Sequence, residues 1–277
     1  MPSRHDDDLA FAISLAERAG AIITSSYERV QRIDRKSPRD VVTDVDYRSE
    51  AAVISAIRAR FPDDAILAEE SGHQRDGAPR RRRWGSGRTW VIDPLDGTVN
   101  YANGIPFFCV SVALVEDGRP VAGVVLDPLR GETYAATADG PATLNGHRIT
   151  ASAKESLADF VISLSIIGRG GIAKERRIQQ AVRIHRRMGS AALAIAYVGS
   201  GRFDAFVGNG GMSPWDIAAA GLIAERAGAV VSDVHGGPWW NTKRRGPSLS
   251  IVAAPPLQHA ELLALLRAAR TTVQTRR

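Results

Sequence analysis

The sequence has few of the features that mark an exported or membrane-bound protein. Its 277 residues include one cysteine, Cys109, which excludes an internal disulfide and a metal site built from a cysteine cluster. The longest apolar run, Ala191 to Val198, is far too short to cross a bilayer. The first residues, Met1 to Asp8, contain no apolar export segment. These absences predict a soluble cytoplasmic protein with no membrane partner.

The overall composition is that of an ordinary globular protein. Apolar residues make up 44% of the chain and charged residues 24%. The length predicts one large domain or two small ones with a sizeable core. The net charge of +6 and the pI of about 9.9 make nucleic acid and anionic small molecules the partners to consider.

Part of the positive charge is concentrated in one segment between Gly72 and Gly87. Arg80 to Arg83 are consecutive, and Arg75 and Arg88 lie close by. The segment is rich in glycine and arginine and lacks apolar periodicity, which predicts a mobile surface loop. A solvated loop is the simpler interpretation, and a flap that faces an anion or nucleic acid is the alternative.

Hydrophobic periodicity predicts a first half of α+β type with an antiparallel sheet and a second half in which strands and helices alternate. Turn signals occur at Asp117-Gly118 and Asn145-Gly146. The predicted helices are Leu9–Ile23, Asp44–Phe61 (capped by Thr43 or Asp44), Lys174–Arg186, Ala191–Val198, Pro214–Ala227 and Leu257–Ala269. The predicted strands are Ala65–Ala68, Thr89–Ile92, Val110–Val115, Val121–Leu126, Glu132–Thr137, Phe160–Leu164, Asp204–Val207, Val230–Asp233 and Leu249–Ala253.

The most informative stretch runs from Trp90 to Thr98, where an apolar strand ends in two aspartates. Pro94 fixes the backbone between Asp93 and Asp96, and Gly97 allows a tight turn, so both carboxylates can enter one small volume. Carboxylates suit hard cations such as Mg²⁺, and free N–H groups at a helix start suit a phosphate. The alternative is that both aspartates are turn and capping residues.

Three further segments place acids at the ends of predicted elements. Glu69-Glu70 closes another apolar strand, and adjacent acids are costly to hold together without a cation. Asp40, Asp44 and Asp46 lie at a loop-to-helix junction, and Asp216 opens a helix. Each has a simpler interpretation: Glu70 as a surface acid, Asp44 as an N-cap, and Asp216 as a complement to the helix dipole.

Together these segments resemble the inositol monophosphatase family of lithium-sensitive, magnesium-dependent sugar phosphatases. The resemblance covers residues 36 to 233. The segments that carry it are Asp40-x-x-Thr43-x-x-Asp46, Glu69-Glu70-Ser71, Asp93-Pro94-Leu95-Asp96-Gly97-Thr98-x-Asn100, Gly189-Ser190-Ala191-Ala192, Arg202-Phe203-Asp204-Ala205 and Trp215-Asp216-x-Ala218-Ala219. It implies a layered αβαβα sandwich with an antiparallel sheet in the N-terminal half and a mixed sheet in the C-terminal half. Residues 1–153 would carry most metal ligands, and residues 154–277 would carry Asp216 and the substrate contacts.

The resemblance also implies the reaction, which is hydrolysis of a small phosphate monoester by a metal-activated water. Inositol 1-phosphate is the expected substrate and Li⁺ an expected inhibitor. Two or three Mg²⁺ ions are implied. Glu69, Asp93 and the carbonyl of Leu95 would hold one, Asp93, Asp96 and Asp216 would hold a second, and a looser third would rest largely on Glu69.

The remaining roles follow from the same resemblance. Gly97 and Thr98 would bind phosphate oxygens, and Ala191 and Asp216 would contact the substrate. Thr98 would orient the water while donating a hydrogen bond to Asp46, so the implied catalytic residues are Glu69, Thr98 and Asp46. No nucleophilic serine or cysteine is needed, and Cys109 is interpreted as a core residue. Relatives are commonly homodimers, so a homodimer is expected.

The sequence departs from the family where the substrate is recognised. Gly208 stands where inositol-specific members carry a glutamate, and Ala191 argues against a histidinol phosphatase. Fructose 1,6-bisphosphate, 3′-phosphoadenosine 5′-phosphate and NADP(H) are therefore alternative substrates. The arginines at 80 to 83 could bind a second phosphate. A partner that binds RNA or a transcription complex through its basic surface is the alternative of a different class, with nucleic acid the less favoured partner.

Overall fold

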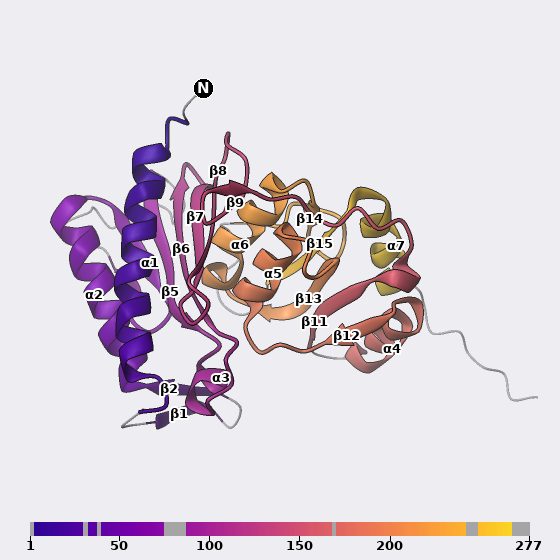
Figure 1. Cartoon of the computed structure of the whole chain (residues 1–277), viewed down its shortest axis with the longest axis horizontal. Coiled ribbons are helices and arrows are strands. Elements are labelled where there is room, and N and C mark those ends of the chain that lie inside the picture. Colours follow the sequence, from indigo (N-terminus) through magenta and orange to yellow (C-terminus); the bar gives the residue numbers. More distant parts are fainter. Residues whose placement is uncertain are drawn as a thin grey trace, which may run out of the picture.

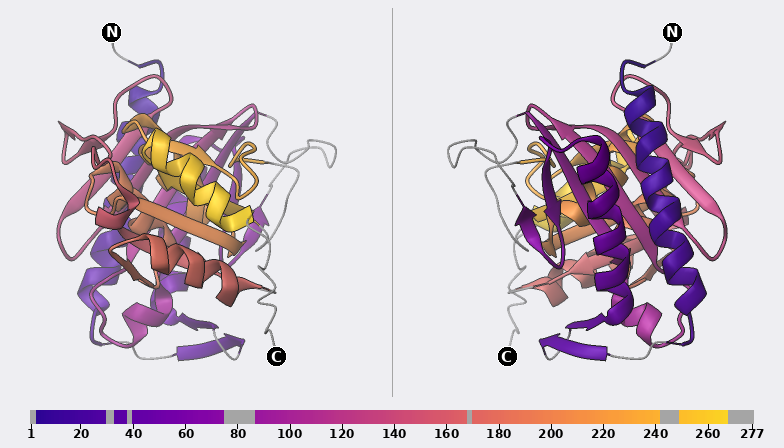
Figure 2. Two further views of the ribbon diagram at one scale, coloured as in Figure 1. Left: turned by 90° about the vertical axis from the view of Figure 1, so that its right-hand side faces the viewer. Right: turned by 90° about the vertical axis from the view of Figure 1, so that its left-hand side faces the viewer.

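The computed structural model describes residues 3–29, 33–37, 40–74, 87–167, 170–241 and 249–267. These residues form five layers (Figure 1). Helices α1 and α2 cover one face of an eight-stranded sheet, and α5 and α6 lie between its other face and a five-stranded sheet. Helices α4 and α7 cover the far side (Figure 2). This arrangement confirms the predicted αβαβα sandwich.

The helices begin where the sequence places capping groups. Asp6 to Asp8 supply negative charge to the first turn of α1, and Thr43 caps α2, whose third residue, Asp46, completes a capping box. Pro214 occupies the start of α6. The helices are α1 (Asp6–Ser26), α2 (Asp44–Arg60), α3 (Thr98–Ala102), α4 (Gly171–Ala181), α5 (Ala191–Gly199), α6 (Pro214–Arg226) and α7 (Pro256–Arg267), with a 3-10 turn, η1 (Leu157–Asp159).

The large sheet is antiparallel except at one pair. Its strand order is β10-β9-β8-β7-β6-β5-β3-β4, which confirms the predicted antiparallel sheet, with β3 and β5 as the one parallel pair among the described strands. The connection from β3 to β5 allows both strands to end at the same edge. The strands are β3 (Ala65–Ala68), β4 (Gly72–Gln74), β5 (Arg88–Asp96), β6 (Cys109–Glu116), β7 (Arg119–Asp127), β8 (Glu132–Thr137), β9 (Thr143–Leu144) and β10 (His147–Arg148). A separate hairpin contains β1 (Ile33–Ser37) and β2 (Asp40–Thr43).

The prediction that Gly72 to Gly87 is all loop is wrong at its start. Gly72–Gln74 forms β4, antiparallel to β3, because the edge of β3 offers unpaired backbone groups that a short strand can satisfy. The arginines at positions 75 and 80 to 83 lie outside the described residues.

The small sheet is mixed, as predicted, with the order β12-β11-β13-β15-β14. Strands β12, β11 and β13 are parallel, and β15 is antiparallel to both β13 and β14. The predicted helix Lys174–Arg186 is too long: α4 ends at Ala181, and Ile184–Arg186 pairs with the edge of β11 instead. The strands are β11 (Val161–Ile166), β12 (Ile184–Arg186), β13 (Ala205–Met212), β14 (Val230–Ser232) and β15 (Leu249–Ala254).

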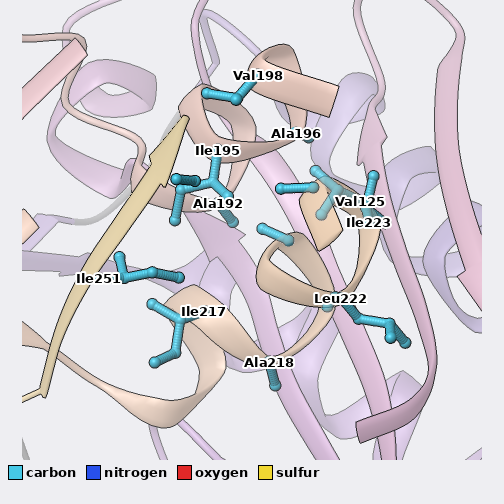
Figure 3. Close-up of a cluster of buried hydrophobic side chains, with 14 of the residues drawn as sticks. Val125, Ala192, Ile195, Ala196, Val198, Ile217, Ala218, Leu222, Ile223 and Ile251 are labelled. Atoms are coloured by element: carbon cyan, nitrogen blue, oxygen red, sulfur yellow. The ribbon is translucent and has the colours of Figure 1, made fainter. Parts of the chain in front are cut away.

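Helices α5 and α6 form a middle layer that is apolar on all sides. Figure 3 shows Ile195 of α5 and Ile217 of α6 packed toward Ile251 of the small sheet. On the other side, α6 rests directly on β7, where a Cβ at Gly123 would lie 2.8 Å from Ala219 Cα. The middle layer therefore joins the two sheets into one core, with α6 fixed against the large sheet.

The predicted division at residues 153 and 154 falls between β10 and β11, the last strand of one sheet and the first of the other. Because one buried cluster draws residues from both sides of that point, the two-domain division stays a prediction. Among the described residues, no helix is both long and apolar enough to span a bilayer.

Candidate active site

Two parallel strands deliver the first carboxylates to one edge of the large sheet. Glu69 follows β3, and Asp93 lies at the matching level of the neighbouring strand β5. The pairing of β5 with β6 becomes irregular between Asp93 and Asp96, where Pro94 has no N–H to donate. This irregularity brings Asp96 to the same edge, as the sequence predicted.

A further carboxylate comes from the other half of the chain. Asp216 is the third residue of α6, and its Oδ2 accepts a hydrogen bond of 2.7 Å from the backbone N–H of Ser213. One carboxylate oxygen each of Asp93, Asp96 and Asp216 lies within 4.8 Å of the others. Asp216 thus caps its helix and also faces the acids of the large sheet.

The carboxylates surround a cavity of about 170 Å³, which we call the acid cavity. Its lining is Glu69, Asp93, Leu95, Asp96, Gly97, Thr98, Val99, Gly189 and Asp216. The structure therefore brings together all the residues to which the resemblance assigns Mg²⁺, including Leu95 for its carbonyl oxygen. The two phosphate-binding residues implied at the start of α3 line the same cavity.

The acid cavity is a strongly negative environment. Burial raises the pKa of Asp93 well above its ordinary value, and repulsion from Glu69, Asp96 and Asp216 raises it further. Burial, followed by repulsion from Asp96, has the same effect on the pKa of Asp216. A divalent cation would remove this repulsion, and the donor set consists of hard oxygen ligands. The residues present therefore fit Mg²⁺.

Asp96 is held by three donors from two other segments, the start of α5 and β6. Its Oδ2 accepts hydrogen bonds from Ser190 Oγ (2.6 Å), the backbone N–H of Ala192 (2.7 Å) and Cys109 Sγ (3.7 Å). Burial raises the pKa of Asp96, and these bonds act in the opposite direction. Asp96 is thereby fixed to the N-terminus of α5, and none of these donors was assigned a role from the sequence. The Cys109 thiol has two polar partners, Asp96 Oδ2 and Ser190 Oγ. Its position in an apolar strand gave no indication of either contact.

Gly97 and Thr98 form the turn from β5 into α3. Gly97 has φ of +97°, and a Cβ there would lie 3.2 Å from Phe107 O, so the turn requires glycine. Thr98 Oγ1 lies 2.9 Å from Asp46 Oδ1 and 3.0 Å from Leu95 O. The implied hydrogen bond from Thr98 to Asp46 is thus present, and Asp46 is held in turn by the backbone N–H of Thr43 (2.8 Å).

Asn100 was part of the quoted motif but received no role from the sequence. Its Nδ2 donates to Phe107 O (2.6 Å) and Met188 O (2.7 Å), which joins the loop after α3 to the segment before α5. Gly189 beside it has φ of +83°, and a Cβ there would lie 2.7 Å from Asn100 Nδ2. In the sequence, the only indication that Asn100 belongs to the site was its position two residues after Thr98 in the same motif.

A second cavity of about 340 Å³, which we call the leaving-group cavity, shares Asp96, Gly189 and Asp216 with the acid cavity. Ala191 is one of its lining residues, and so is Arg187, whose guanidinium pairs with Glu175. The other lining residues are Ser163, Leu164, Ser165, Ile167, Met188, Ser190, Phe206 and Met212. The parallel strands β11 and β13 supply several of them, and the carboxyl ends of such strands commonly form ligand sites.

Gly208 is not one of the residues that line this cavity. A Cβ at Gly208 would lie 3.0 Å from Phe206 Cε1 and 3.4 Å from Met212 Cγ. A larger residue would therefore displace two side chains of the cavity wall. The side chains of Lys36 and Asp40 lie outside what the structure describes.

The comparisons with known proteins agree with this geometry. The chain matches the inositol monophosphatase family over residues 5–272. It is 38% identical over 263 residues to the Nus factor SuhB of Pasteurella multocida, covering 92% of this chain and 94% of that protein. It is also 38% identical over 232 residues to a fructose-1,6-bisphosphatase/inositol-1-monophosphatase of Thermotoga maritima, covering 83% of this chain and 86% of that protein.

Solved structures give the same result at the level of the fold. The SuhB protein of Bartonella henselae superimposes with a TM-score of 0.86 at 30% identity, covering 95% of this chain and 100% of that chain. A Thermotoga maritima IMPase superimposes with a TM-score of 0.83 at 34% identity, covering 94% of this chain and 96% of that chain. The family match spans nearly the whole sequence. The chain belongs to the inositol monophosphatase family.

Proposed function

We propose that this protein is a Mg²⁺-dependent phosphatase that hydrolyses small phosphate monoesters, with inositol 1-phosphate as the principal substrate. The observation that carries the proposal is the acid cavity, in which Glu69, Asp93, Asp96 and Asp216 meet beside Thr98. An uncatalysed phosphate monoester hydrolyses extremely slowly, so catalysis depends on concentrated positive charge and accurate positioning. The carboxylates of the acid cavity would meet the need for positive charge by binding a cation.

The carboxylates of Glu69, Asp93, Asp96 and Asp216 and the carbonyl oxygen of Leu95 are the groups that would hold Mg²⁺. When bound, the cation neutralises phosphate charge and lowers the pKa of a water molecule. Asp93 is central to this set, because Glu69, Asp96 and Asp216 all act on its pKa.

The other side chains orient the reactants. Because the Thr98 hydroxyl can donate its proton to Asp46, its oxygen can accept a hydrogen bond from the attacking water. We expect the backbone N–H groups of Gly97 and Thr98, which line the acid cavity, to bind phosphate oxygens. As the water oxygen bonds to phosphorus, the ester P–O bond breaks. The water gives up a proton, the departing alkoxide takes one up, and the resulting alcohol leaves into the leaving-group cavity.

The experiment is release of inorganic phosphate from a panel of phosphate monoesters, with and without Mg²⁺. We expect the highest kcat/KM for inositol 1-phosphate, no turnover in EDTA, and inhibition by Li⁺. Absence of Mg²⁺-dependent turnover on every substrate would contradict the proposal. A homodimer is expected in the same preparation, and light scattering after size-exclusion chromatography would measure it.

Fructose 1,6-bisphosphate is the second candidate substrate. Arg187 lines the leaving-group cavity, where a guanidinium group could bind a second phosphate. The Thermotoga maritima relative named for both activities supports the same candidate. A higher kcat/KM for the bisphosphate than for inositol 1-phosphate would favour this assignment. Activity on 3′-phosphoadenosine 5′-phosphate or NADP(H), and binding to RNA or a transcription complex, stay predictions.

A further inference from the structure

Glu50 is a buried acid of α2 with no role in the reaction described above. Its side chain is 3% exposed, and each carboxylate oxygen accepts a backbone hydrogen bond. Oε2 lies 2.8 Å from the N–H of Glu70, and Oε1 lies 2.9 Å from the N–H of Ser71. A buried carboxylate is costly unless its oxygens have partners, so this pairing explains how Glu50 is tolerated in the interior.

The position of Glu50 on α2 links its two hydrogen bonds to the acid cavity. Glu50 follows Asp46 by four residues, so both carboxylates lie on the same face of the helix. Asp46 accepts the hydrogen bond of Thr98 on one side of the acid cavity. Glu50 holds the turn after β3 on the other side, directly beyond Glu69. One helix face therefore supports both margins of the acid cavity without lining it.

This support matters because the turn after β3 carries a carboxylate into an acidic region. Glu69 and Asp93 both line the acid cavity, so the two carboxylates lie in one small volume. Like charges this close together favour separation unless a cation lies between them. The two hydrogen bonds that Glu50 accepts fix the backbone directly after Glu69 and limit its freedom to move out of the cavity.

We propose that Glu50 is a positioning residue that holds Glu69 in place for Mg²⁺ and thereby sets the metal affinity of the acid cavity. The inference rests on the proposed metal-dependent function. Outer partners of metal ligands typically change metal affinity about 10- to 100-fold when removed. Glu50 acts one step further out than usual, because it orients the ligand through the backbone of the following two residues.

The test is isothermal titration of MgCl₂ into metal-free protein for two variants. Glu50→Gln keeps the length of the side chain but turns one acceptor into a donor that faces a backbone N–H. Glu50→Asp keeps the charge but is one methylene too short to reach both amides. If Glu50 acts by positioning, both variants bind Mg²⁺ at least about tenfold more weakly. Excess Mg²⁺ should restore most of the kcat of each.

Asp127→Asn is the matched control. Asp127 is also buried, at 1% exposure, and accepts hydrogen bonds from the two backbone N–H groups of Leu129 and Arg130 in a loop that does not line the acid cavity. This variant should lower the melting temperature without changing the Kd for Mg²⁺. A purely structural role for Glu50 would give the same pattern in the Glu50 variants.

The possible results separate this proposal from the proposed function. If wild-type protein binds Mg²⁺ and the folded Glu50 variants bind it equally well, the positioning role is wrong and the phosphatase assignment is unaffected. Weaker binding by Glu50→Gln alone would indicate a charge effect and would also overturn positioning. If Glu50→Gln does not fold, Glu50→Asp decides the question. If wild-type protein binds no Mg²⁺, both proposals fail.

Discussion

The acid cavity and the leaving-group cavity adjoin but are built differently. The acid cavity is lined by short motifs whose acids, glycine and threonine each have a chemical reason to be where they are. The leaving-group cavity is lined by residues such as Met188, Phe206 and Met212, which belong equally well to a core. Short sequence motifs therefore predicted the residues of the acid cavity, whereas most residues of the leaving-group cavity belong to no such motif.

The largest effect is expected from Asp96→Asn, which removes a carboxylate shared by both cavities. The asparagine oxygen can still accept the hydrogen bond of Ala192, so the fold should persist. Because a direct ligand should matter more than an outer partner, we expect turnover to fall by at least about 100-fold. Phosphate release with saturating Mg²⁺ measures this, and circular dichroism checks folding. Asp233→Asn, a loop carboxylate bonded to two backbone N–H groups, is the control and should retain activity.

Thr98→Val tests the water-orienting role within the acid cavity. The substitution keeps the shape of the side chain but removes the hydroxyl that bonds to Asp46. We expect kcat to fall about 10- to 100-fold, with little change in the Kd for Mg²⁺, because the water loses its orientation. Thr98→Ser keeps the hydroxyl and should retain most of the activity. Equal kcat values for the valine and serine variants would rule out this role.

Arg187→Gln tests the leaving-group cavity alone. If Arg187 binds a second phosphate, KM for fructose 1,6-bisphosphate should rise about tenfold, equivalent to ~1.4 kcal/mol, while KM for inositol 1-phosphate changes little. Arg183→Gln is the control, because Arg183 pairs with Asp159 as Arg187 pairs with Glu175, but Arg183 does not line the cavity. An equal rise of KM for both substrates would show that Arg187 does not distinguish them.

The smallest expected effect is a pH-dependent change in stability. Because the pKa values of Asp93 and Asp216 are raised in the folded state, that state keeps protons that the unfolded chain releases above pH ~4. The metal-free protein should therefore lose stability as the pH rises from about 4 through the raised pKa values. Mg²⁺ should restore the stability most at high pH, and each ~1 kcal/mol corresponds to about 2–4 °C in Tm.

Differential scanning calorimetry in EDTA and in MgCl₂ at several pH values measures this effect. Asp216→Asn removes one of the repelling carboxylates, so its metal-free Tm should depend less on pH than that of the wild type. If Mg²⁺ raises Tm equally at pH 5 and pH 8, the acid cavity does not bind the cation in the way proposed.

The fold was largely predictable where hydrophobic pattern and end signals agree. The predicted strands ending at Glu69 and Asp93 and the helix that starts near Asp44 all occur. The errors arose where pairing with a distant strand decides the outcome. Ile184–Arg186 is a strand because β11 has an open edge, and Gly72–Gln74 because β3 has one. The local sequence of a segment does not show whether a distant strand has an unpaired edge with which it can pair.

The same distinction applies within the site. Asp96 was predictable from its motif, but its partners Ser190 and Cys109 lie 94 and 13 residues away in the sequence. For Glu50, the only indication in the sequence was that it follows Asp46 by four residues on a predicted helix. Contacts of this kind depend on how layers pack, which a single sequence does not display. This is why the acids of the cavity could be predicted and the residues that support them could not.

The close packing of α6 on β7 has a consequence for how this protein can be divided. Because Asp216 is part of α6, the acid cavity is complete only when residues far apart in the chain have folded together. A fragment ending near residue 153 would hold Glu69, Asp93 and Asp96 but lack their fourth partner. The acid cavity therefore needs both halves of the sandwich, and it could not be transplanted as a single loop.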